Sequence, residues 1–143
     1  MNLHMLNVIL PIVFLLYQIV IDFVDLFPFN DIRARDKRLR KFEVLGNYPP
    51  LILISACFYF EGAWARVGYA MTAIIMAMHL LAWWIPYWTG KPASVRQDYD
   101  KYFSRTYKFL PKIRDHIVPD AEHAGVGALL TVTLAVQSIY MFA

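Results

Sequence analysis

Long apolar runs separated by two basic segments constrain this chain more than any other feature. Of its 14 Lys and Arg residues, all except Arg66 fall between Arg33 and Lys41 or between Lys91 and Arg114. The chain is 59% hydrophobic, whereas soluble domains are about 45–50% apolar. Because the apolar residues are concentrated in runs long enough to cross a bilayer, the sequence predicts an integral membrane protein.

Composition also excludes several classes of protein. The formal net charge is +3, but the basic residues flank apolar runs, so membrane orientation explains them better than nucleic acid does. Cys57 is the only cysteine, which rules out an intrachain disulfide and a dithiol redox centre. The first residues have neither a basic region nor a small-residue cleavage site, so we expect a retained first span.

The outer two membrane spans follow from length and helix signals. The first is predicted over about 3–27, where Pro28 ends it, and the last over about 121–142. Asp120 is the expected N-cap of the last span, and Glu122 lies in its first turn, where the helix dipole favours an acidic residue.

The middle run, Leu51 to Trp88, is interrupted by Glu61 and Arg66. A single crossing would put the two basic segments on opposite sides of the membrane, whereas a hairpin keeps both on the cytoplasmic side, as the positive-inside rule requires. We therefore expect spans over about 48–62 and 67–88, with Pro49 and Pro50 in the first turn of the shorter one.

The predicted fold is therefore all-α: a single membrane domain forming a four-helix transmembrane bundle, with both termini outside. The cytoplasmic loops are 28–47 and 89–120. The first is expected to orient the protein and to contact anionic headgroups, the alternative being a phosphate site. In the second, apolar residues at helical spacing predict an interfacial amphipathic helix over 94–109, which either rests on lipid or bundle or forms a lid over a cavity.

Polar residues at membrane depth are the candidates for function, because they are costly to bury in lipid. On the first span they fall on one helical face with Pro11, and this face should point into the bundle. Its polar members are His4, Asn7, Gln18, Asp22 and Asp25.

Five polar residues are expected to converge at the cytoplasmic mouth: Asp22, Asp25, His79, Glu122 and His123. If the protein is an enzyme, Asp22 or Asp25 would act as general acid or base, with His79 or His123 as proton partner. The simpler interpretation pairs both aspartates with loop arginines. A ligand pocket at the same level would include Gln18, Trp83, Tyr87 and Glu122. No metal site and no cofactor are expected.

The last span carries small residues at helical spacing, which allow membrane helices to approach closely, either within the bundle or between copies. They are Ala124, Ala128, Thr131, Ala135 and Ser138.

The C-terminal part of the chain also resembles a known group of proteins. The resemblance covers roughly residues 83–123 and is carried by Trp83-Trp84-Ile85-Pro86-Tyr87, Tyr102-Phe103, Arg105-Thr106, Phe109-Leu110-Pro111 and Pro119-Asp120-Ala121-Glu122-His123. These motifs resemble a family of small bacterial four-span membrane proteins of uncharacterised activity. The resemblance implies a bacterial plasma-membrane location and no particular reaction.

Three functions are compatible with these features. The favoured one is a homo-oligomer or membrane-complex subunit whose cytoplasm-facing polar pocket binds a lipid or amphiphile. The second is an enzyme acting on a lipid or isoprenoid-like substrate at the inner leaflet. The third is a small transporter or channel, for which an apolar plug at Phe14 and Leu15 would be contrary evidence. Membrane lipids are expected partners and nucleic acid is not.

Overall fold

The computed structural model describes residues 2–92 and 94–143, and this part of the chain contains helices and no strands. The long elements are α1 (Leu3–Phe23), α2 (Lys37–Phe60), α3 (Gly62–His79) and α6 (Ala121–Phe142). The π-helical segment η1 (Leu80–Trp84) and α4 (Ile85–Thr89) continue α3. The short α5 (Val95–Asp98) and the π-helical η2 (Tyr99–Phe103) follow in the second basic segment.

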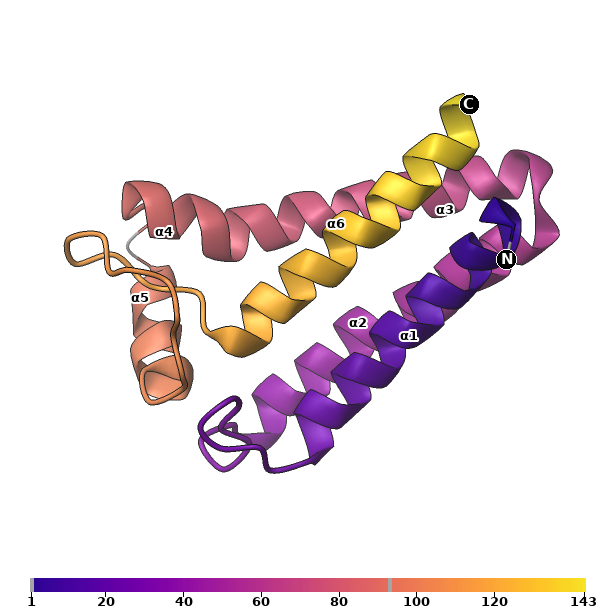
Figure 1. The fold of residues 1–143 in the computed structure, drawn as a ribbon. Helices are drawn as coiled ribbons and strands as arrows, with labels where there is room; N and C mark the ends of the chain where they lie inside the picture. The colour runs from indigo at the N-terminus through magenta and orange to yellow at the C-terminus, as the bar shows by residue number, and fades with distance from the viewer. Residues whose placement is uncertain (1, 93) are drawn as a thin grey trace.

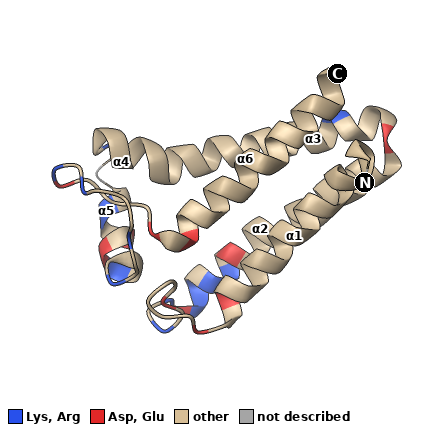
Figure 2. Cartoon of the chain, in the orientation of Figure 1, with Lys and Arg blue, Asp and Glu red and all other residues tan. Residues whose placement is uncertain are grey.

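The long helices converge at one end and spread apart at the other (Figure 1). The termini and the α2–α3 turn lie at the converging end, while α5 and η2 lie where the helices diverge. Lys, Arg, Asp and Glu gather at the divergent end (Figure 2), which we call the charged end. The middle apolar run is a hairpin as predicted, because Glu61 alone separates α2 from α3.

Three helices are long and apolar enough to cross a membrane: α1, the continuous Gly62–Thr89 rod and α6. The fourth expected span is not among them, because the first half of α2 carries Lys37, Arg38, Arg40, Lys41 and Glu43. Over the described residues the protein is therefore all-helical, with three membrane-capable helices.

Two expected boundaries are wrong at the charged end of the α1–α2 pair. α1 ends at Phe23 rather than Phe27, because the Asn30 amide donates to the carbonyls of Ile21 and Val24, both at 2.8 Å. α2 begins at Lys37 rather than near residue 48, because Asp36 caps it by accepting from the amide of Leu39 at 2.9 Å.

Pro49 and Pro50 consequently lie inside α2 and not in its first turn. Each lacks an N–H, so the carbonyls of Leu45 and Gly46 lose their usual helical partners while the helix continues.

Of the other two spans, the bounds of one are as predicted and the other is longer. α6 matches the predicted 121–142, with Asp120 as N-cap accepting from the amide of His123 at 3.0 Å. The third helix extends beyond the predicted 67–88, to Gly62 and Thr89.

The helix predicted over 94–109 is also shorter than expected. Helical structure there covers only Val95–Phe103, because the hydroxyl of Thr106 turns back to the carbonyl of Phe103 at 2.7 Å and to the Asp120 carboxylate at 2.6 Å. The Lys108 ammonium donates to the same Phe103 carbonyl and so closes the helix end.

The core consists of two apolar clusters along the bundle. Phe14, Leu51 and Leu130 form the centre of the one nearer the charged end, and Ile54, Phe58 and Ala65 form the other. Gly68 lets α3 approach α2 closely, since a Cβ there would lie 2.9 Å from the Cβ of Cys57. Large apolar side chains remain exposed along the outer faces of the helices, as a lipid environment requires.

Candidate functional site

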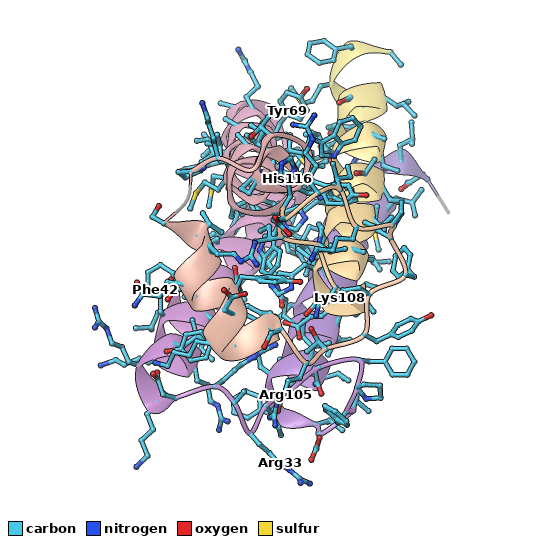
Figure 3. The ribbon with its side chains drawn as sticks, turned by 90° about the vertical axis from the view of Figure 1, so that its left-hand side faces the viewer. Arg33, Phe42, Tyr69, Arg105, Lys108 and His116 are labelled. Carbon is cyan, nitrogen blue, oxygen red and sulfur yellow. The ribbon has the colours of Figure 1, made fainter. Side chains whose placement is uncertain are left out.

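The two basic segments contact each other at the charged end. The Arg105 guanidinium donates to Asp31 at 2.6 Å, and the Lys101 ammonium lies 3.2 Å from the Asp36 carboxylate. The amide of Tyr107 donates to the carbonyl of Pro28 at 2.7 Å. Figure 3 looks onto this end, where Arg33 and Arg105 lie towards the same edge. These contacts hold residues 28–36 against residues 101–107.

Arg35 is the centre of a buried ion network behind this surface. Its side chain is only 1% exposed. It donates to Asp22 of α1 at 3.1 Å and to Glu43 of α2 at 3.4 Å, and it also bonds Glu122 of α6. Burial alone would lower the pKa of the guanidinium, but the carboxylates of Glu122, Glu43 and Asp22 raise it overall. One buried cation thus connects three helices.

An open cavity of about 440 Å³ adjoins this network. Its inner wall is apolar and includes Phe14, Ile75 and Leu130, and its outer wall is formed by α5 and η2. This volume is within the range typical of ligand pockets, about 300–1,000 Å³. The remaining chemistry-bearing residues that line it are Gln18, Asp22, Glu43, Asn47, His79, Trp83, Asp98, Tyr99, Tyr102, Glu122 and His123.

The two histidines that line the cavity are held by neighbouring groups. His79 Nε2 accepts a hydrogen bond from the Trp84 indole at 3.2 Å, and it packs against Gly127, where a Cβ would lie 3.0 Å away. The ring of His123 stacks on Trp83 at 3.5 Å between centroids, and its Nδ1 pairs with Asp120 at 2.7 Å.

Asp120 is fully buried. Burial alone would raise the pKa of its carboxyl, but His123 and the Thr106 hydroxyl lower it overall. Asp120 therefore holds His123 in place while capping α6.

The structure brings together six of the eight residues singled out in the sequence. Gln18, Asp22, His79, Trp83, Glu122 and His123 all line the cavity. The other two lie elsewhere.

Asp25 pairs with the exposed Arg33 at 2.6 Å, and the Tyr87 hydroxyl donates to the carbonyl of Pro111 at 2.9 Å. The expectation that Asp25 converges with Asp22 is therefore wrong, whereas the pairing of both aspartates with loop arginines is confirmed.

The sequence does not single out two residues of the buried network. Arg35 belongs to a segment that reads as an orientation signal, and Glu43 falls within the predicted loop 28–47. The Asp36 N-cap, with Leu39, Phe42 and Leu45 at helical spacing after it, is the signal that would put Glu43 on a helix. Burial raises the pKa of the Glu43 carboxyl to about 7, against the opposing effect of Arg35. Glu43 can therefore exchange a proton near neutral pH.

Asp22, one of the candidate general acids or bases, is already bonded within the chain. Both oxygens of Asp22 are engaged, one by Arg35 at 3.1 Å and the other by the Tyr48 hydroxyl at 2.9 Å. Of the four residues expected to converge in an enzyme, Asp22, His79 and His123 line the cavity and Asp25 does not. Within residues 2–92 and 94–143, no group of three His, Cys, Asp or Glu side chains is arranged to hold a metal ion.

Comparisons with known proteins return no match: no family model, no curated protein and no solved structure is similar to this chain.

Proposed function

We propose that the protein crosses the membrane four times, with both basic segments on the cytoplasmic side and both termini outside. The loop contacts support this arrangement, because Arg105 and Asp31 could not touch if a bilayer separated their segments. An even number of crossings must then lie between the two basic segments. The Gly62–Thr89 rod supplies one of these crossings and α2 supplies the other. The basic residues identify that side as the cytoplasmic one, and the resemblance of residues 83–123 to bacterial proteins suggests a plasma membrane.

In this arrangement the crossing part of α2 is short. It would run from about residue 48 to Phe60, which at 1.5 Å per residue is roughly 20 Å and less than the hydrocarbon thickness of an average bilayer. Local thinning of the bilayer, or contact with other proteins, would accommodate it.

We further propose that the cavity binds a lipid or other amphiphile from the inner leaflet. The observation that carries this proposal is the division of its wall into an apolar inner part and a polar, charged mouth. A ligand with an apolar chain and a polar head would match both parts at once.

A continuous transport path has less support, because an apolar layer closes the inner end of the cavity. Phe14 and Leu130 are fully buried there and pack with Leu51. An ion or polar solute would have to pass this layer to reach Asn7 on the far side.

Assembly into an oligomer or complex is part of the proposal. Ala128, Thr131 and Ala135 of the small-residue stripe on α6 are exposed, so they do not pack within the chain. The Thr131 hydroxyl donates to the carbonyl of Gly127 at 2.7 Å. The stripe therefore presents a shallow, hydrogen-bond-satisfied surface to a second helix.

Native mass spectrometry of gently extracted protein tests amphiphile binding. Gly46 lines the cavity, and a Cβ added there meets nothing within 4 Å, so Gly46→Phe can introduce a ring at the cavity wall. Wild-type protein should carry a bound amphiphile, and Gly46→Phe should lose it. The matched control is Ala77→Phe on an exposed face of α3 outside the cavity lining. Equal adducts on all three proteins would refute the pocket.

A further inference from the structure

The charge inside the cavity is opposite to the charge of the end at which it opens. Asp22, Glu43, Asp98 and Glu122 line it, and among the described lining residues there is no Lys or Arg. A ligand that enters through a basic surface therefore meets carboxylates.

Ion pairs do not balance these acids one for one, although His123 in the same lining also acts on Glu43 and Glu122. Arg35 is the only described cation that forms an ion pair with Asp22, Glu43 or Glu122, and it does not line the cavity. One guanidinium thus faces three carboxylates from behind. An anionic headgroup inside the cavity would find acceptors where it needs donors, and buried like charges repel strongly.

Gln18 gives an independent indication of a ligand. It is only 6% exposed and lines the cavity one helical turn from Asp22. No described residue forms a hydrogen bond with its side-chain amide. Since the amide borders the open cavity, water or a ligand there would satisfy it. Glu43 and Glu122 each pair with Arg35 through one oxygen only, so their other oxygens and the Gln18 carbonyl would together supply the several acceptors that an ammonium group requires.

Aromatic rings complete the surroundings of that position. Trp83 comes from η1, while Tyr99, Tyr102 and Phe103 come from η2, and all four line the cavity. Aromatic faces attract cations, including quaternary ammonium groups. One face of each ring is already covered: Arg35, Lys101 and Lys108 lie over Phe103, Tyr102 and Tyr99, and His123 stacks on Trp83, so a ligand cation would use the opposite faces. The apolar inner wall is then left for the hydrocarbon chain.

We propose that the ligand of this cavity is a cationic amphiphile, whose ammonium head lies among Gln18, Asp22, Glu43 and Glu122 and whose chain packs against Phe14 and Leu130. This inference rests on the proposed amphiphile pocket and adds the chemistry of the head. It excludes phosphate and carboxylate heads from the same position.

The test compares three probes that share one chain and differ in the head: dodecylammonium, dodecanol and dodecyl phosphate. Each is titrated against the purified full chain in a non-ionic detergent, and occupancy is read by native mass spectrometry at about pH 8, where Glu43 is largely ionised. Dodecylammonium should reach half-occupancy at a concentration at least about tenfold lower than the other two, as expected for charge-assisted hydrogen bonds.

Variants of the protein test recognition of the ligand's polar head separately from recognition of its hydrocarbon chain. Glu43→Gln should weaken dodecylammonium about tenfold and leave dodecanol unchanged. Gln18→Leu gives a second test if the first variant folds poorly, and it should weaken the same probe. Glu61→Gln, at the opposite end of the bundle, is the matched control and should change neither probe.

The outcomes distinguish this inference from the pocket itself. If the three probes bind equally and Gly46→Phe abolishes the binding of all of them, the amphiphile pocket is supported and the proposed preference for an ammonium head is overturned. A preference for dodecyl phosphate overturns the ammonium head as well. If Gly46→Phe affects no probe, both proposals fail.

Discussion

Arg35 and Arg33 show how two nearby arginines of one basic segment can have different roles. Each pairs with an aspartate, but the Arg33 side chain is 83% exposed and that of Arg35 is 1% exposed. Exposed ion pairs contribute little to stability, whereas removing one member of a buried pair leaves a costly uncompensated charge. The burial of the guanidinium, and not its charge alone, makes Arg35 structural.

Arg35→Ala should therefore lower the free energy of unfolding by about 3–5 kcal/mol, because Asp22, Glu43 and Glu122 lose their shared cation. Arg33→Ala is the matched control and should change it by less than about 1 kcal/mol. Denaturant titration in mild detergent measures both variants. Equal effects would contradict the network.

Glu43 should give the stability a pH dependence near neutrality. Its pKa is raised to about 7 by burial and by repulsion from Asp22 and Glu122, with Arg35 and His123 opposing. A carboxyl whose native pKa is raised stabilises the fold while it is protonated, and this contribution is lost as the pH rises through about 7. The unfolding free energy of Glu43→Gln relative to wild type should therefore increase from about pH 5 to about pH 8. Parallel curves for the two proteins would show that Glu43 does not titrate here.

At the scale of elements, local sequence signals were sufficient to predict the bounds of a helix where no tertiary contact ended it early. The bounds of α6 could be predicted because its apolar length and the Asp120 cap are both properties of neighbouring residues. The start of α2 was missed because its first turns are basic and resemble a loop, although Asp36 caps them. Residues 104–109 keep a helical pattern, yet the buried bond from Thr106 to Asp120 ends the helix, and no local signal reports a partner so far along the chain.

Asp36 connects two of these elements. It caps α2, and it also accepts from the Tyr102 hydroxyl at 2.6 Å and from Lys101 at 3.2 Å. Asp36→Ala should cost about 1 kcal/mol for the lost cap and should speed amide hydrogen exchange over 95–103. Asp36→Asn keeps an oxygen acceptor and is the control. Unchanged exchange in the alanine variant would mean that η2 is held by its apolar contacts alone.

The exposed small residues of α6, Ala128, Thr131 and Ala135, are expected to form the contact between copies of the chain. Ala135→Leu adds bulk on the exposed face, so it should weaken close helix–helix approach and lower the copy number. Native mass spectrometry and chemical crosslinking in membranes measure this directly. Ala77→Leu on α3 is the control, since Ala77 is equally exposed but outside the stripe. A wild-type monomer in native membranes would remove the basis for assembly.

At the scale of the whole molecule, the sequence could locate the charged end as the place to look but not the identity of its central residues. The requirement that both basic segments lie on the same side of the membrane predicted the hairpin, and with it the side on which Asp22, His79 and His123 lie. It could not distinguish Arg35 from the other arginines, because burial depends on three helices that are distant in sequence. The acidic character of the cavity was likewise hidden within a basic segment, since Glu43 and Asp98 are outnumbered there by Lys and Arg.

The most direct test of the whole account asks on which side of the membrane each basic segment lies. Single cysteines replace the exposed residues Arg33, Ser104 and Ala63 in a Cys57→Ser background, and a membrane-impermeant maleimide is applied to sealed vesicles of each orientation. Positions 33 and 104 should react from the same, cytoplasmic face and position 63 only from the other. Reaction of positions 33 and 104 from opposite faces would contradict the four-crossing arrangement, and with it the cavity that the two segments build together.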